Sequence, residues 1–348
     1  LGRDDTRTRK ARRMRVLHVV PSLASRTGGP ATSVVESSLA LQRCGVDVTI
    51  FATDMAEAAS ARTHTRASAS DLHAGASGLD VRLFPARRPY RLAFSPAMFR
   101  VLRAEVRRYD LVHIHSLFLF PQFAAYRAAS GAGVPYVVSP RGALDPYLRQ
   151  RGRRLKVVAE RLWQGAMLTQ AAALHLTSDE EARLTADVAL RVPRHVVPNG
   201  IRSGDYSELP SGQGFRRRYL GGSDDPVVMY LGRLSHTKGL DILIRAFAIA
   251  RRDGPACRLA IVGPDDEGLT VELTALARRE GVAEHVVLTG MLSGVEMLDA
   301  LAAASVWTLP SHTENFGNAV VEALAAGRAT VISAAVNIAP EIAASDAG

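Results

Sequence analysis

The sequence predicts an α/β protein with two parallel-sheet domains, on three observations. Strand and helix patterns alternate along nearly the whole chain, which is typical of successive βαβ units. The 348 residues suffice for two domains of ordinary size, and 47% of them are hydrophobic, which supplies a core for each. A stretch rich in Gly, Ser, Pro and charge separates the halves. We therefore predict a first domain over 14–201, a linker over 202–225 and a second domain over 226–348.

The charge of the chain narrows the choice of partners. The net charge is +9, which suits nucleic acid, an anionic membrane or a phosphorylated substrate. Six Lys/Arg against two Asp fall in residues 1–13, which we predict to be a disordered basic arm. The sequence has no zinc finger, RNA-recognition signature or interleaved basic and aromatic residues, so nucleic acid is not expected as a partner.

Cysteine use and hydrophobic runs favour an intracellular protein. Cys44 and Cys257 lie far apart, so the sequence predicts neither a disulfide framework nor a cysteine metal site. The apolar run 16–20 is too short for a signal peptide, and no uncharged run is long enough to span a membrane. We therefore expect a cytoplasmic protein.

The first half begins with a predicted strand over 15–20 and a helix from about 30 to 43. Between them, Gly28 and Gly29 precede Pro30, which suits the first turn of a helix because no N–H partner is needed there. Glycine lets a backbone approach a ligand closely. We expect a phosphate or acceptor contact at this turn, with a plain tight turn as the alternative.

Further strands are predicted over 46–53, 81–85 and 110–116, and the last contains two histidines. Side chains alternate along a strand, so His113 and His115 share a face. His115 is nearer the carboxyl end, where parallel sheets bind ligands, and we expect a functional role for it. His113 is expected to be an ordinary core histidine.

The next predicted strand, 135–139, leads directly into Arg141. Residues 141–161 carry seven Lys/Arg against two acids. A solvated helix face would account for this charge, and so would attraction to a lipid diphosphate or an anionic membrane. The last strand of this half, 195–200, ends in a turn that contains Asn199.

In the second half, two cations bracket the loop between a strand over 227–231 and a helix that starts near Leu240. They are Arg233 and Lys238. A helix dipole disfavours cations at its N-terminus, so a diphosphate held between them would remove the conflict. The glycine spacing differs from that of a Walker loop. Further strands are predicted over 258–264, 286–292, 306–310 and 330–334.

A stretch near the end, 311–327, combines two carboxylates with a helix start. Glu314 precedes the turn 316–318, and Glu322 lies in the helix that follows. The first N–H groups of a helix attract anions. Two carboxylates that bind hydroxyl groups, with an anion-binding site between them, match the shape of a sugar joined to a nucleoside by a diphosphate. An ordinary amphipathic helix with solvated glutamates is the alternative.

The order and spacing of the motifs agree with one family of enzymes. The motifs are the GGP loop, the HIH strand, SPRGALDP, VVPNGI, GRLSHTKGL, VGP and ENFGNAVVEALAAG, and they cover nearly the whole chain from Met14. The chain resembles the retaining glycosyltransferases of family 4, the glycosyl transferases group 1. SPRGALDP resembles the bacterial polysaccharide and exopolysaccharide enzymes of that family. The resemblance implies a GT-B fold, in which two Rossmann-like domains face each other across a cleft.

The resemblance also implies that a nucleotide-sugar donor lies mainly on the second domain. Arg233 and Lys238 would hold its diphosphate. Glu322 would bind the ribose hydroxyls, and Glu314 would contact the transferred sugar. The neighbouring groups expected to contact the donor belong to Phe316, Gly317 and Asn318.

The first domain is expected to complete the site. The resemblance implies that Gly28 and Gly29 lie against the donor phosphates and that His115 sits by the reacting sugar. We expect His115 to share the catalytic role with Arg233, Lys238 and Glu314. Arg141 and Asn199 are expected to contact the acceptor or a phosphate.

The expected reaction uses no metal and no other cofactor. No D-x-D triplet occurs, so a divalent ion chelated in that way is not expected. Arg233, Lys238 and a helix N-terminus would instead stabilise the departing nucleoside diphosphate. The resemblance implies transfer with retention to a saccharide or polyprenyl-linked saccharide. We expect peripheral attachment to the inner face of the cell membrane through the basic stretches.

Two features depart from the family pattern. Ala329 stands where a proline is usual, which we expect to alter a turn. Family members continue with further helices, one of which crosses back onto the first domain. We therefore expect a truncated C-terminal end and a cleft that is poorly tied together.

Two other functions fit many of the same motifs. A sugar-nucleotide epimerase of GT-B fold would need no acceptor. A degenerate, non-catalytic binder of nucleotide sugars would need none of the reacting groups, and the intact Arg233, Lys238, Glu314 and Glu322 disfavour it.

Overall fold

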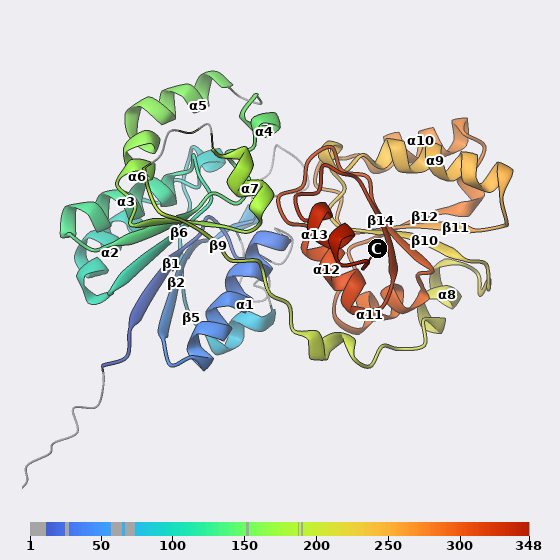
Figure 1. Ribbon diagram of the computed structural model, residues 1–348, viewed down its shortest axis with the longest axis horizontal. Helices are drawn as coiled ribbons and strands as arrows, with labels where there is room; N and C mark the ends of the chain where they lie inside the picture. The colour runs from blue at the N-terminus through green and yellow to red at the C-terminus, as the bar shows by residue number, and fades with distance from the viewer. Residues whose placement is uncertain are drawn as a thin grey trace, which may run out of the picture.

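The structure is a computed structural model, which describes residues 12–24, 28–56, 65–66, 74–150, 153–186, 188 and 191–347. Nearly all of the predicted basic arm lies outside these residues. Figure 1 shows two α/β lobes side by side, an N-terminal lobe in blue to green and a C-terminal lobe in yellow to red. Their parallel sheets have seven and five strands. The predicted α/β class with two parallel sheets is confirmed.

The sheet of the N-terminal lobe has the strand order β5-β2-β1-β6-β7-β8-β9, and all neighbours are parallel. The strands are β1 (Arg15–Val19), β2 (Asp47–Thr53), β5 (Asp80–Phe84), β6 (Leu111–His115), β7 (Tyr136–Ser139), β8 (Ala173–Leu176) and β9 (Arg194–Val196). β9 is shorter than predicted because Pro198 lacks the N–H that a continuing ladder needs.

Helices cover both faces of this sheet. Met98 and Leu102 of α2 are buried on one face together with side chains of α3 and α6, and Val35 of α1 is buried on the other. The longer helices are α1 (Gly29–Arg43), α2 (Pro96–Glu105) and α3 (Phe120–Ala132). The shorter ones are α4 (Pro146–Gln150), α5 (Arg153–Ala159), the π-helical η6 (Glu160–Gln164), α6 (Gly165–Thr169) and α7 (Asp179–Leu184). The remaining elements are η3 (Ala74–Gly78), η4 (Tyr90–Leu92), η5 (Val106–Arg108) and the hairpin of β3 (Met55–Ala56) with β4 (Thr65–Arg66).

The C-terminal lobe is built around the sheet β12-β11-β10-β13-β14. Trp307 and Tyr230 are fully buried in its core. Its strands are β10 (Val227–Leu231), β11 (Arg258–Val262), β12 (Val286–Gly290), β13 (Val306–Leu309) and β14 (Ala329–Ile332). Its helices are α9 (Leu240–Asp253), α10 (Thr270–Arg279), α11 (Gly294–Ala303), α12 (Asn318–Ala325) and α13 (Ala339–Ala344), with η8 (His236–Lys238) and η9 (Ala283–His285).

The predicted linker, 202–225, forms η7 (Ser203–Tyr206) and α8 (Gln213–Tyr219). Phe215 and Leu220 of this segment are buried in the core of the C-terminal lobe. At its other end, Arg202 pairs with Glu36 of α1 at 3.2 Å. The segment is therefore attached to both lobes, and the domain boundaries stay a prediction.

Candidate active site

A cavity of about 420 Å³ lies between the two lobes and is lined by both. Every site residue expected from the sequence, except His115, lines this cavity. From the N-terminal lobe these are Gly28, Gly29, Arg141 and Asn199, and from the C-terminal lobe Arg233, Lys238, Glu314, Phe316, Gly317, Asn318 and Glu322. Residues that are almost 300 positions apart in the sequence therefore face one space.

The two glycines at the start of α1 allow the opposite lobe to come close. Gly28 has a positive φ of 68°, and a Cβ placed on it would lie 3.9 Å from the side chain of Arg233. A Cβ on Gly29 would lie 3.5 Å from Nδ2 of Asn318. Pro30 has no N–H, and the N–H groups of Ala31 and Thr32 both donate to the Gly28 carbonyl, at 3.0 and 3.2 Å. The loop therefore contributes a close backbone approach beside a cation of the opposite lobe, rather than a row of free helix donors.

Lys238 and Glu314 form an ion pair at the cavity wall. Their side chains are 19% and 17% exposed. Lys238 ends η8, between β10 and α9, and Glu314 precedes α12. A phosphate that contacts Lys238 would share its ammonium with Glu314. The ion pair therefore links Lys238, which is expected to contact a phosphate, to Glu314, which is expected to contact the transferred sugar.

The turn before α12 places backbone donors at the cavity. Gly317 takes φ 79° as the N-terminal cap, and Phe316 beside it is buried. A Cβ on Gly317 would lie 3.0 Å from Cγ2 of Val320 and 3.3 Å from Cγ of Glu314. Only glycine takes this tight left-handed turn without strain. The turn therefore holds Glu314 and the start of α12 side by side.

Glu322, one turn into α12, has an unusual environment for a carboxylate. Burial raises its pKa to about 7. Among the residues that the structure describes, no side chain pairs with it or donates a hydrogen bond to it. A half-buried carboxylate with no donor among the described residues is costly, so a ligand with hydroxyl groups would stabilise it.

Side-chain hydrogen bonds cross the cleft at two places. Nδ2 of Asn318 donates to the Gly29 carbonyl at 3.2 Å and to Oγ of Ser33 at 3.1 Å, and its Oδ1 accepts from Nδ2 of Asn199 at 2.9 Å. The sequence led us to expect a poorly tied cleft. These bonds tie the start of α12 to α1 and to the end of the N-terminal lobe.

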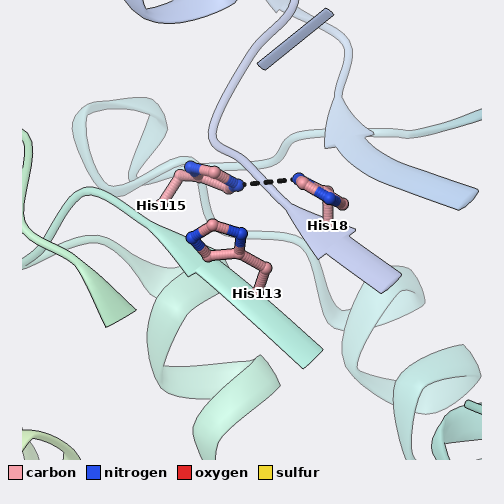
Figure 2. Close-up of side chains that lie close together, drawn as sticks. All are labelled: His18, His113 and His115. Atoms are coloured by element: carbon pink, nitrogen blue, oxygen red, sulfur yellow. Dashed lines mark hydrogen bonds between the residues drawn. The ribbon is translucent and has the colours of Figure 1, made fainter. Parts of the chain in front are cut away.

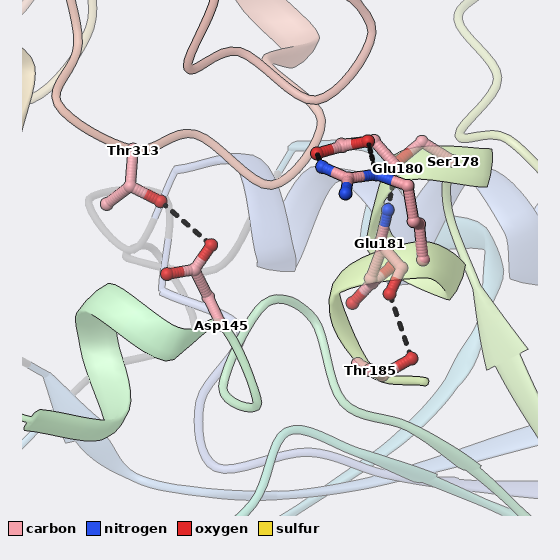
Figure 3. A network of polar contacts seen from close by, with 7 residues as sticks. Asp145, Ser178, Glu180, Glu181, Thr185 and Thr313 are labelled. Atoms are coloured by element: carbon pink, nitrogen blue, oxygen red, sulfur yellow. Dashed lines mark hydrogen bonds and ion pairs between the residues drawn. The ribbon is translucent and has the colours of Figure 1, made fainter. Parts of the chain in front are cut away.

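The sequence did not indicate the second group of hydrogen bonds across the cleft. Oγ1 of Thr313 donates to Asp145 at 3.3 Å, and Nδ2 of Asn315 donates to Oγ1 of Thr177 at 2.9 Å. Figure 3 shows the Thr313 contact, which reaches from the C-terminal lobe down to Asp145. Asp145 lies inside the motif SPRGALDP and Asn315 inside ENFGNAVVEALAAG, but no local pattern indicates which residue of the other lobe each one meets.

Arg141 lies at the cavity in a left-handed backbone conformation, with φ 55°. Its guanidinium donates from Nη1 to Oδ1 of Asn199 at 2.6 Å and from Nη2 to Nδ1 of His115 at 3.3 Å. Burial lowers its pKa to about 10, and the Glu181 carboxylate opposes that shift. The cation therefore stays charged near neutral pH.

His115 is buried, 3% exposed, and lies behind Arg141 rather than on the cavity wall. Figure 2 shows it beside His113 on β6 and His18 on β1. Ring nitrogens of the three lie within 4.8 Å of one another, a spacing that a metal ion could bridge. His18 was missed from the sequence, although a single polar residue inside the apolar strand RVLHV was a signal.

Comparison with known proteins agrees with this geometry. Residues 28–200 match the family described as glycosyl transferase 4-like domain, and residues 214–347 match glycosyl transferases group 1. The D-inositol 3-phosphate glycosyltransferase of Actinosynnema mirum is 31% identical over 350 residues, covering 88% of this chain and 76% of the relative. The enzyme of the same name from Xylanimonas cellulosilytica is 30% identical over 330 residues, covering 88% and 75%.

Solved structures share the fold. Anabaena HepE in complex with UDP and glucose superposes with a TM-score of 0.72 at 21% identity, covering 94% of this chain and 83% of that one. Sucrose-phosphate synthase from Thermosynechococcus elongatus gives 0.70 at 18% identity, covering 95% and 84%. These superpositions show the GT-B fold, and the family matches together with the relatives at 30% identity or more make the chain a glycosyltransferase. The chain belongs to the glycosyl transferases group 1 family.

Proposed function

We propose that this protein transfers a sugar from a nucleoside-diphosphate donor to a saccharide or lipid-linked saccharide acceptor, with retention and without a chelated metal ion. The observation that carries the proposal is the convergence at one cavity of Arg233, Lys238, the start of α12 and Glu322, which has no donor among the described residues. Two cations and a helix N-terminus suit a diphosphate. A half-buried carboxylate suits the paired hydroxyls of a ribose.

The chemistry follows from where charge develops. As the sugar departs, negative charge grows on the leaving diphosphate, and in this proposal Arg233, Lys238 and the first N–H groups of α12 stabilise it. Removing one such donor costs on the order of 3–4 kcal/mol of barrier, or about 10²–10³ in rate. Closure of the two lobes around a bound donor would exclude water, which would otherwise hydrolyse it.

The relatives suggest which substrates to test first. HepE is described with UDP-glucose, and the relatives from Actinosynnema and Xylanimonas are named for D-inositol 3-phosphate. A UDP-sugar is therefore the first donor to test. A phosphorylated polyol joins the saccharide and the polyprenyl-linked saccharide as a third acceptor class.

Calorimetry with UDP, GDP and ADP, with and without chelator, tests the donor site. We expect one nucleotide to bind, with affinity unchanged by chelator and about 10- to 100-fold weaker in Glu322→Gln, because a hydrogen bond to a charged group is lost. The matched control is Glu272→Gln, an exposed glutamate on α10. Binding of no nucleotide would overturn the proposal. Conversion of donor alone into an isomer would favour an epimerase.

We also propose peripheral attachment to the cytoplasmic face of the membrane. No helix in the described ranges is long and apolar enough to cross a bilayer. In α5 and η6, Val158 and Leu162 are 54% and 71% exposed, and Arg149 and Arg161 lie nearby in the sequence. Exposed apolar side chains among cations suit an anionic lipid surface.

Sedimentation with lipid vesicles tests this attachment. We expect binding to anionic vesicles, little binding to neutral ones, and a loss of binding in a Val158→Ser, Leu162→Ser variant. The control is Val271→Ser, an exposed apolar residue on α10. Equal sedimentation of all variants would refute a role for this surface.

A further inference from the structure

A row of polar side chains lies beneath Arg141 on one face of the N-terminal sheet. His18 of β1 is in register with His113 of β6, and His115 is in register with Ser139 of β7. The alternate residues of β6 are buried in the apolar core on the opposite face. The polar face therefore places these rings directly behind the cavity, where Figure 2 shows His115 directed toward His18.

The hydrogen bonds fix the proton positions in the first pair of rings. An arginine can only donate, so Nδ1 of His115, 3.3 Å from Nη2 of Arg141, must accept. Neutral His115 then carries its proton on Nε2 and donates it to Nδ1 of His18 at 2.9 Å. His18 in turn carries its proton on Nε2, which has no partner within the described residues. Every donor along this path points away from the cavity.

The same reasoning fixes a second path. Nε2 of His175 lies 2.9 Å from the Val197 carbonyl, which can only accept, so His175 carries its proton there. Its Nδ1 therefore accepts from Oγ of Ser139 at 2.9 Å, and Ser139 accepts from Nε2 of His113 at 2.8 Å. This path ends at Val197. Two residues further on, Oδ1 of Asn199 accepts from the other edge of the Arg141 guanidinium.

The rings stay neutral, as both paths require. Burial lowers the pKa of His18 to about 3 and lowers those of His113 and His115 well below their ordinary value, and the Arg141 cation adds to each shift. Burial also lowers the pKa of His175. A protonated His115 would turn a donor toward the donor of Arg141, so the contact exists only with the neutral ring.

The first path is incompatible with a metal ion shared by the three rings. An ion on Nε2 of His115 would force the proton onto Nδ1, against the Arg141 donor. An ion on Nδ1 would displace Arg141 altogether. Among the described residues around the three rings, Arg141 is a cation and no carboxylate pairs with a ring. A second positive charge, such as a metal ion, is therefore also disfavoured there.

We propose that His18 and His115 are positioning residues that hold the Arg141 guanidinium at the cavity, so that it can take an anionic group of a substrate. The lone pair on Nδ1 of His115 fixes one edge of the guanidinium, and Oδ1 of Asn199 fixes the other. His18 keeps His115 in the required tautomer. The role of the held cation rests on the proposed function, because the proposed nucleoside-diphosphate donor, or a phosphorylated acceptor, would carry the anionic group.

Nuclear magnetic resonance on the full chain with ¹⁵N-labelled histidine and arginine tests this arrangement. At pH 7.5 we expect His18 and His115 as neutral rings protonated on Nε2, and an Arg141 guanidinium whose rotation is slow. His115→Leu should free that rotation and weaken the response of the Arg141 signals to inorganic phosphate about tenfold, because the acceptor is lost. His115→Asn should retain both, because its Oδ1 can accept in place of Nδ1. His195→Asn, at an exposed site on β9, is the control.

The outcomes separate this inference from the proposed function. A His115 ring protonated on Nδ1 or on both nitrogens would overturn the inference, even if a nucleotide binds. So would one equivalent of Zn²⁺ that shifts all three rings and leaves Arg141 unchanged. The tautomers are read in the unsubstituted protein, so a poorly folded His115→Leu would not remove the test. Failure of every nucleotide to bind, with the tautomers as stated, would overturn only the proposed donor site.

Discussion

Glu322 is a carboxylate whose surroundings favour its protonated form. Burial raises its pKa to about 7, and the described residues offer it no donor. Ribose hydroxyls would donate to the ionised form and lower that pKa again. Ligand binding and proton release are therefore expected to be coupled at this one residue.

We predict that nucleotide binding near pH 7 releases a fraction of one proton, because bound Glu322 is ionised and free Glu322 is partly protonated. Calorimetry in two buffers of different ionisation enthalpy measures this release. Affinity should rise as the pH increases through about 7. Glu322→Gln should bind with no release, and equal heats in both buffers for the unsubstituted protein would contradict the assignment.

Glu314 competes with a ligand phosphate for the same ammonium. Its ion pair with Lys238 must be shared or broken when a diphosphate binds. We predict that Glu314→Gln leaves nucleoside-diphosphate affinity unchanged or tighter while donor turnover falls about 10²–10³. Calorimetry and a turnover assay on one preparation measure both. A loss of affinity equal to the loss of turnover would mean that Glu314 only holds the ground state.

At the scale of the element, the left-handed turn at Gly317 couples the start of α12 to the cavity. Gly327, at the far end of the same helix, also has a positive φ, 67°, but nothing lies within 4 Å of a Cβ built there. Both glycines adopt a left-handed backbone conformation. Only Gly317 adds crowding against Val320 and Glu314.

This difference gives a matched pair of substitutions. Gly327→Ala should cost roughly 1–2 kcal/mol of unfolding free energy, because alanine resists the left-handed conformation. Gly317→Ala should cost more than that, because its Cβ would also crowd Val320 and Glu314. Only Gly317→Ala should also weaken nucleotide binding. Thermal unfolding and calorimetry measure the two effects, and an equal loss of binding in both variants would mean that α12 as a whole, rather than its first turn, controls the site.

For the whole molecule, the buried histidines make stability depend on pH. His18, His113, His115 and His175 all have lowered pKa values in the folded state, whereas an unfolded histidine titrates near 6.5. Below that pH the unfolded chain binds protons that the folded chain cannot, so stability falls. Glu322, with a raised pKa, acts in the opposite direction between its unfolded and folded values.

The pKa of His285 is lowered as well, so the histidines outweigh the one glutamate and stability falls on acidification. We predict that the free energy of unfolding falls between about pH 6.5 and 5, by up to about 1.4 kcal/mol per pH unit for each net proton. Urea unfolding at several pH values measures this slope. His18→Asn should flatten it and the exposed His195→Asn should not, whereas a pH-independent stability would show that the rings are protonated in the folded protein.

The sequence by itself determined the class of the fold and indicated the motifs whose residues line part of the cavity. Strand and helix periods are local properties, and motifs such as ENFGN carry their own turn geometry, so both can be read from neighbouring residues. The same information pointed to Gly28, Gly29, Arg233 and Glu322, which line one cavity in the structure, and their roles stay a prediction.

Only the tertiary structure decided which of these groups meet. The pairing of Lys238 with Glu314 depends on how distant elements pack within a lobe, and the bonds of Asn318 and Asn315 depend on how the two lobes approach. The place of His115 behind Arg141 depends on the register of neighbouring strands and on the left-handed turn at Arg141. A one-dimensional spacing holds no information about these contacts, because they join segments separated by tens to hundreds of residues.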